Sequence, residues 1–153
     1  MPAIEYRDIA ATVQLLIIIG GWFFIARDND RRERRKELRL TLNELIKQVH
    51  NLEFEAIAYF GAPNDDGEAL RTANLQRGLK RLGLSLQRLR DLNPDLVVTP
   101  QLVRFRHRMT YYDFGAADRV PWHVNDAQLQ EIMIAGHELA AVMDKWFYSK
   151  YDR

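Results

Sequence analysis

Residues 38–60 read LRLTLNELIKQVHNLEFEAIAYF, and the spacing of the apolar residues in this stretch decides the fold. Because an α-helix has about 3.6 residues per turn, side chains alternately four and three positions apart share one stripe along it. The stretch therefore predicts a helix that buries one face, in a helical bundle within the chain or in a coiled coil between chains. We favour the bundle. The stripe consists of Leu38, Leu42, Leu45, Val49, Leu52, Ala56 and Tyr59.

Three further helices are predicted C-terminal to this stretch. Turn-forming residues at 61–67 end the first helix, and the second begins near Asp65 or Asp66. Leucines at 75, 79, 82, 86 and 89 repeat the same spacing, and the second helix ends near Asn93. Thr99 is expected to cap a third helix with Pro100 in its first position, which runs to about Tyr112.

The sequence Asn-Asp-Ala-Gln at 125–128 is expected to cap a final helix that runs to about Lys150. No stretch alternates apolar and polar residues convincingly, so no strand is predicted. The apolar face of the final helix consists of Leu129, Ile132 or Met133, Gly136, Leu139, Met143 and Trp146.

An uncharged run of 18 residues, 9–26, precedes the first stripe. As a helix it would extend about 27 Å, close to the hydrocarbon thickness of a thin bilayer. We expect a transmembrane helix, in which Gln14 is a polar residue able to hydrogen bond with another helix. A buried soluble helix and a cleaved signal peptide are the alternatives. The signal peptide fits poorly, since the N-terminus MPAIEYRD has no positive region.

A basic segment follows the predicted span directly. Residues 27–39 contain seven Lys or Arg and four Asp or Glu. Basic segments resist translocation, so the C-terminal side is expected in the cytoplasm and residues 1–8 outside the inner (cell) membrane. The interleaved acidic residues argue against nucleic-acid binding. Contact with lipid head groups is expected from Arg27, Arg31, Arg32, Arg34, Arg35 and Lys36.

The sequence thus predicts an all-α, single-pass membrane protein. Its parts are an extracytoplasmic N-terminus (1–8), a transmembrane helix (9–26), a basic juxtamembrane segment (27–37) and a cytosolic antiparallel bundle of about four helices (38–153). Antiparallel connectivity returns the C-terminus to the bilayer, where Trp146 and Lys150 are candidate surface contacts. In the alternative interpretation, Trp146 and Phe147 close the core.

Patterns typical of catalysis are not present. The chain has no cysteine, and His50 precedes Glu53, the reverse of the Glu-x-x-His order of di-metal bundles. We therefore expect no catalytic, cofactor or metal site and lean against an enzyme.

The irregular segment around residues 106–122 is the best candidate for contact with a protein partner. Aromatic residues and arginine dominate the energetics of protein interfaces. In the alternative interpretation, the loop closes the end of the core with Phe114 and Trp122. The candidate residues are His107, Tyr111, Tyr112, Asp113, Phe114, Arg119 and Trp122.

These features favour a scaffold, adaptor or regulatory subunit that binds the lipid bilayer and a cytosolic or membrane protein. The alternative is a membrane-acting effector, a small toxin or exclusion factor, that oligomerises through its transmembrane span.

Overall fold

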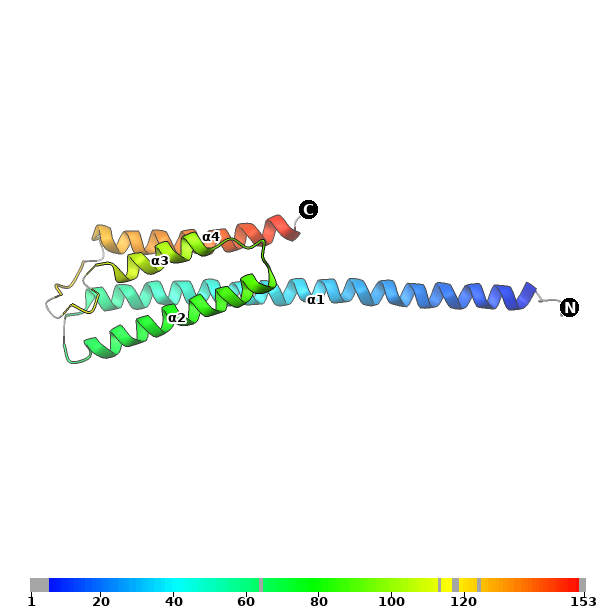
Figure 1. Cartoon of the computed structure of the whole chain (residues 1–153), viewed down its shortest axis with the longest axis horizontal. Helices are drawn as coiled ribbons and strands as arrows, with labels where there is room; N and C mark the ends of the chain where they lie inside the picture. Colours follow the sequence, from blue (N-terminus) through cyan, green and yellow to red (C-terminus); the bar gives the residue numbers. More distant parts are fainter. Residues whose placement is uncertain (1–5, 64, 113, 117–118, 124, 152–153) are drawn as a thin grey trace. The chain divides into compact units, whose positions relative to one another are not determined.

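Four helices form the part of the chain that the structure, a computed structural model, describes: residues 6–63, 65–112, 114–116, 119–123 and 125–151. Within residues 6–24 the structure describes one side chain, that of Trp22. The predicted all-α class is confirmed, and these residues contain no strand. The helices are α1 (Tyr6–Gly61), α2 (Glu68–Leu92), α3 (Thr99–Thr110) and α4 (Ala127–Tyr151) (Figure 1).

The chain divides into two compact units, Met1–Leu40 and Thr41–Arg153. Unit 1 contains the N-terminal part of α1, and unit 2 contains the remainder of α1 together with α2, α3 and α4. α1 continues without a break through residues 30–33.

The predicted transmembrane segment, 9–26, falls within α1. The side chains of residues 9–21, 23 and 24, Gln14 among them, lie outside the described residues. Among the residues that are described, no helix has a stretch long and apolar enough to span a membrane. The described side chains of residues 25–37 are exposed, and Arg32 forms an ion pair of 3.0 Å with Asp28.

The apolar stripes predicted on α1 and α2 form the core of unit 2. Leu42, Leu45, Val49, Leu52, Ala56 and Tyr59 of α1 are buried, as are all five predicted leucines of α2. Contacts within a single chain bury these side chains, so the stripes pack against each other in an intramolecular bundle. Phe105 and Met109 of α3 complete this core together with the predicted face of α4, in which Ile132 is buried and Met133 is 42 % exposed.

Two helix starts differ from the prediction. α2 begins at Glu68 with Gly67 as its N-cap, because Asp65 Oδ1 accepts a 2.8 Å hydrogen bond from Gly67 N and forms a turn before the helix. α3 begins at Thr99 with Val98 as its N-cap. The Thr99 hydroxyl does not cap the helix and instead accepts a bond of 3.2 Å from Arg90 Nη1.

The C-terminal end of α4 lies beside the turn between α2 and α3. Trp146 Nε1 donates to Asp95 Oδ2 at 3.0 Å, and Lys150 Nζ donates to Asp95 Oδ1 and Asn93 Oδ1, each at 3.1 Å. Burial raises the pKa of Asp95, but the hydrogen bonds from Lys150 and Trp146 outweigh it and the pKa is lowered. Trp146 and Phe147 are both buried. The contact of Trp146 and Lys150 with the bilayer surface stays a prediction.

Gly136 allows a close approach among α1, α3 and α4. A Cβ atom at this position would lie 2.7 Å from Glu53 Cδ and 2.9 Å from Phe105 Cε2. Glu53 is itself fixed by a 2.8 Å contact between its Oε2 and His50 Nδ1. The absence of a side chain at Gly136 is thus a packing requirement of the bundle.

Candidate functional site

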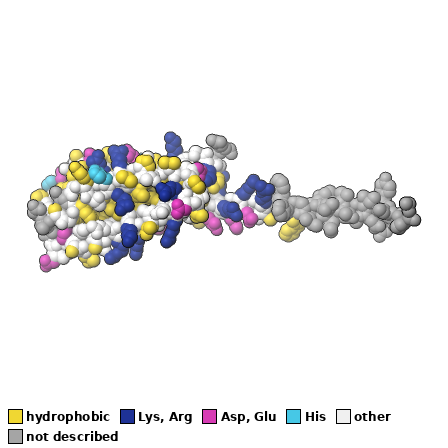
Figure 2. Space-filling model, in the orientation of Figure 1, with side chains coloured by type: hydrophobic (Ala, Val, Ile, Leu, Met, Phe, Trp, Pro, Cys, Tyr) yellow, Lys and Arg dark blue, Asp and Glu magenta, His cyan; other side chains and the backbone are white. Residues whose placement is uncertain are grey.

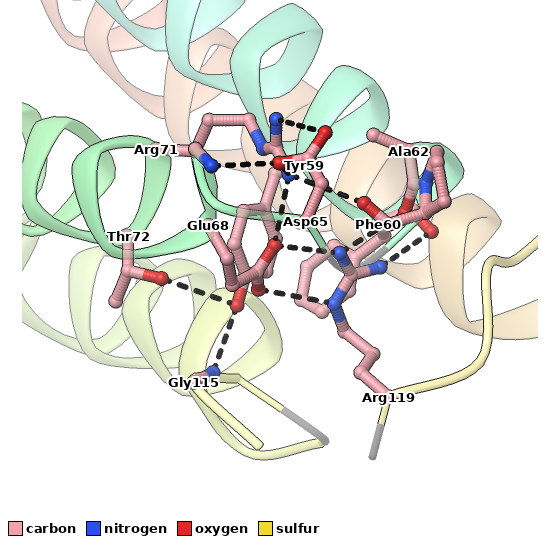
Figure 3. A network of polar contacts seen from close by, with 11 residues as sticks. Tyr59, Phe60, Ala62, Asp65, Glu68, Arg71, Thr72, Gly115 and Arg119 are labelled. Carbon is pink, nitrogen blue, oxygen red and sulfur yellow. Dashed lines mark hydrogen bonds and ion pairs between the residues drawn. The ribbon is translucent and has the colours of Figure 1, made fainter. Parts of the chain in front are cut away.

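The loop between α3 and α4 packs where α1 ends and α2 begins. Trp122 N donates to Phe60 O at 2.8 Å, and Gly115 N donates to the Tyr59 hydroxyl at 2.8 Å. Gly115 has φ of 77°, a left-handed backbone conformation that side-chain-bearing residues rarely adopt. These contacts place the loop over one end of the bundle (Figure 3).

Arg119 anchors the loop with a fully buried side chain. Its Nη1 donates to Phe60 O at 3.0 Å and its Nη2 to Ala62 O at 3.1 Å. Phe60 O also accepts from Trp122 N, so the guanidinium is its second donor, and it supplies a donor to Ala62 O just after the end of α1. Arg119 also contacts Glu68 twice, through Nη2 at 2.9 Å and through Nε at 3.3 Å.

Glu68 connects this anchor to a second arginine. Arg71 Nη2 contacts Glu68 Oε2 at 3.2 Å and Asp65 Oδ1 at 2.8 Å. Hydrogen bonds from Arg119, and to a smaller extent from Tyr59 and Arg71, hold the pKa of Glu68 below its ordinary value. The hydrogen bonds from Arg71 and from Gly67 N lower the pKa of Asp65 in the same way. Figure 3 shows this network at the junction of α1, α2 and the loop.

The lowered pKa of Glu68 predicts how stability depends on pH. A carboxylate whose pKa falls on folding stabilises the protein above its unfolded-state value, about 4.3 for glutamate, and loses that contribution as the pH falls through the folded-state pKa. We therefore expect the free energy of unfolding of the wild type to fall between about pH 5 and pH 3. The Glu68→Gln variant lacks the titrating group. The difference in free energy of unfolding between this variant and the wild type, measured by urea titration, should therefore narrow over this pH range. A difference in free energy of unfolding that does not change with pH would contradict the lowered pKa of Glu68.

Stacked and edge-on aromatic rings lead from the core to the surface. Trp122 stacks on Phe60 with ring centres 4.1 Å apart and planes at 5°. Tyr112 meets Trp122 edge-on at 5.4 Å, and Tyr111 meets Tyr112 at 5.5 Å. His107 stacks on Tyr111 at 4.5 Å, and both of these residues are exposed. The exposed edge of the loop therefore rests on a rigid aromatic support.

Tyr112 is also fixed through its hydroxyl. It donates to Glu131 Oε2 on α4 at 2.7 Å, and Arg108 Nη1 reaches the same oxygen at 2.9 Å. The hydrogen bond to Glu131 raises the pKa of Tyr112 above its ordinary value. The contact ties the end of α3 to the first turns of α4.

The structure brings six of the seven predicted loop residues to one end of unit 2. Phe114, Arg119 and Trp122 face inward, with Phe114 5.3 Å from Tyr59 between ring centres. The exposed part of the predicted site is thus reduced to His107 and Tyr111. Asp113 lies outside the described residues.

Sequence reasoning missed the network partners of Arg119. It treated Tyr59 as one more apolar position, and it assigned no role to Glu68 or Arg71. Tyr59 carried a usable signal, because a tyrosine hydroxyl at a buried stripe position needs a hydrogen-bond partner. Thr72 Oγ1, at 3.4 Å, and Gly115 N both donate to this hydroxyl.

A second surface, made by α2 and α3, carries most of the positive charge of unit 2. α2 has six Lys or Arg and two Asp or Glu, and α3 has three Arg and no acidic residue. Within the described residues, Lys80, Arg81, Arg88 and Arg106 form no ion pair. Figure 2 shows Lys and Arg side chains beside hydrophobic ones on the visible face of unit 2.

Two grooves run along this surface on either side of Leu84, which is 48 % exposed. The α2–α3 groove, about 320 Å³, is lined by Lys80, Arg106 and Val103 among others. The α1–α2 groove, about 490 Å³, is lined by Arg81, Arg88 and Glu55 among others. Val103 is 60 % exposed, so both walls of the first groove offer apolar atoms to solvent. Leu84 with the charged residues around it, Lys80, Arg81, Arg88 and Arg106, is called the basic α2 face below.

The fold defines the class to which the protein belongs, the all-α helical bundles. The chain matches no protein-family model, and no curated protein and no solved structure matches it significantly. Across the described residues, no group of three His, Cys, Asp or Glu side chains is placed to hold a metal ion.

Proposed function

We propose that the protein is a single-pass membrane protein whose helical bundle binds a partner protein, as a scaffold, adaptor or regulatory subunit. The observation that carries this proposal is the basic α2 face. It combines exposed apolar atoms of Leu84 with cationic side chains that form no ion pair within the described residues. Exposed apolar surface rimmed by charged residues is typical of protein-binding sites, and arginine is enriched among residues that contribute most to binding.

The sequence supports the membrane part of the proposal. Residues 9–26 contain no charge over a length sufficient to cross a thin bilayer, and seven Lys or Arg follow within 27–39. The basic side chains at 27–36 are exposed, as contact with anionic head groups requires. Each such residue near the surface contributes about 1 kcal/mol to membrane attachment.

The exposed edge of the loop offers a second contact for the same partner. His107 and Tyr111 present stacked rings to solvent, and Tyr111 is 65 % exposed. A rigid aromatic side chain loses little conformational entropy when it is buried at an interface. We therefore include these two residues among the candidates for partner contact.

Cross-linking tests the proposal. Cells expressing the tagged full-length chain near its native level are cross-linked, their membranes are extracted in mild detergent, and the proteins that co-purify are identified and quantified. We expect the chain in the membrane fraction with one partner in a fixed ratio. Substitution of both Leu84 and Arg106 by aspartate should reduce recovery of that partner, whereas substitution of Lys145 on α4 should not.

Two results would contradict the proposal. Recovery of the chain alone as a defined homo-oligomer would favour the membrane-acting effector, and recovery in the supernatant after carbonate washing would exclude membrane anchoring.

A further inference from the structure

We propose that the basic α2 face binds an acidic amphipathic helix of the partner protein, with an apolar side chain of that helix placed beside Leu84. This inference rests on the proposed function and specifies the chemistry of the partner.

The exposed side of α2 repeats with the helical period. Arg77, Arg81, Leu84 and Arg88 are alternately four and three positions apart, and Lys80 is three positions from Arg77 and four from Leu84. These residues form one stripe on the side opposite the buried leucines. From residue 77 to residue 88 the stripe extends about 16 Å. This length accommodates about three turns of a partner helix lying along α2.

The grooves explain why an apolar anchor fits beside Leu84. Leu84 borders both grooves, and Gly83, next to it, leaves open space: a Cβ there would meet only Arg106 Nη1, at 3.8 Å. Val103 on the opposite wall is exposed as well. A leucine or phenylalanine placed in the α2–α3 groove would contact apolar atoms from both helices.

Charge determines what must flank that anchor. Lys80 and Arg106 border the α2–α3 groove, and Arg81 and Arg88 border the α1–α2 groove. Glu55 is the one acidic residue among those lining the two grooves. An apolar stripe with glutamate or aspartate on both sides therefore complements this face, and the same stripe flanked by lysine is repelled.

A protein helix fits these features better than a bilayer or a nucleic acid. The apolar atoms lie along concave grooves, whereas a bilayer surface favours protruding apolar and aromatic side chains. No aromatic residue lines either groove, so bases would have no stacking platform. The apolar centre at Leu84 also offers nothing to a phosphate backbone.

Fluorescence anisotropy tests the inference with a synthetic probe. The full-length chain is held in phosphatidylcholine nanodiscs and titrated against a labelled helical peptide about 16 residues long, with a leucine stripe flanked by glutamates. A second peptide has lysines in place of the glutamates. We expect binding of the glutamate peptide, weakening as salt is raised, and at least about tenfold weaker binding of the lysine peptide.

Charge-reversal variants assign the binding to this face. Lys80→Glu combined with Arg106→Glu should weaken binding of the glutamate peptide at least about tenfold, and Leu84→Ser should weaken it separately. Lys145→Glu makes the same kind of charge change on α4 and should leave binding unchanged. Far-UV circular dichroism verifies that each variant remains folded.

Equal binding of the two peptides would overturn the inference, and so would glutamate-peptide binding that survives the double charge reversal. The inference would also be wrong if this face bound only phosphatidylglycerol vesicles, duplex DNA or a second copy of the chain. Failure of the peptide test leaves a co-purified partner in place and rejects only the proposed chemistry. Peptide binding without a co-purified partner would instead reject the proposed function.

Discussion

Replacing Arg119 by methionine should lower the free energy of unfolding by about 3–4 kcal/mol. The substitution keeps most of the side-chain volume and removes the guanidinium. Ala62 O then loses the donor from Arg119, and Phe60 O keeps only the donor from Trp122 N. Glu68, whose side chain is 13 % exposed, loses its closest cation and keeps the more distant Arg71. A buried charge deprived of its partner is among the most destabilising changes a single substitution can make.

Urea titration of the full-length chain, followed by far-UV circular dichroism, measures this loss. Arg104→Met is the matched control, because Arg104 pairs with Glu138 on the surface, where the two side chains are 50 % and 40 % exposed. Arg104→Met should lower the free energy of unfolding by less than about 1 kcal/mol. Adding Glu68→Leu to Arg119→Met should recover part of the loss by removing the carboxylate that has lost its closest cation. Equal costs for the two methionine variants would show that Arg119 does not anchor the loop.

Replacing Gly136 by valine should lower the free energy of unfolding by about 2–3 kcal/mol. The added atoms would overlap Glu53, which contacts His50, and Phe105, whose fully buried ring has little room. Accommodating them requires α4 to move away from α1 and α3, with loss of contacts throughout the core.

Gly83→Val provides the comparison at a helical glycine with open space. A Cβ at Gly83 meets only the end of the flexible Arg106 side chain. Gly83→Val should therefore change the free energy of unfolding by no more than about 0.5 kcal/mol, through helix propensity alone. Similar urea midpoints for the two variants would contradict the packing described for Gly136.

The sequence predicted the bundle well because its helices bury leucine stripes with a regular period. Every stripe position of α1 from Leu42 to Tyr59 is buried, and so is each leucine of the α2 stripe. The choice between Ile132 and Met133 could not be made, because adjacent residues on a helix differ by about 100° and both border the same face. Tertiary packing decides it in favour of Ile132.

The candidate site was harder to predict, because its contacts join residues far apart in the chain. Aromatic and arginine content identified the loop, but composition does not say which side chains face inward. Arg119 meets Glu68 across 51 positions of sequence, and Trp122 of the loop stacks on Phe60 of α1. The basic α2 face could not be predicted in the same way, because the position of Arg106 of α3 beside α2 follows only from the structure.

The proposed orientation in the membrane is tested by labelling single-cysteine variants, since the natural chain contains no cysteine. Ala3→Cys and Ser149→Cys are each expressed in intact cells and treated with a membrane-impermeant maleimide. We predict that the cysteine at position 3 reacts in intact cells and that the one at position 149 reacts only after lysis. Labelling of position 149 in intact cells, with position 3 protected, would contradict the proposed orientation and place the basic α2 face outside the cell.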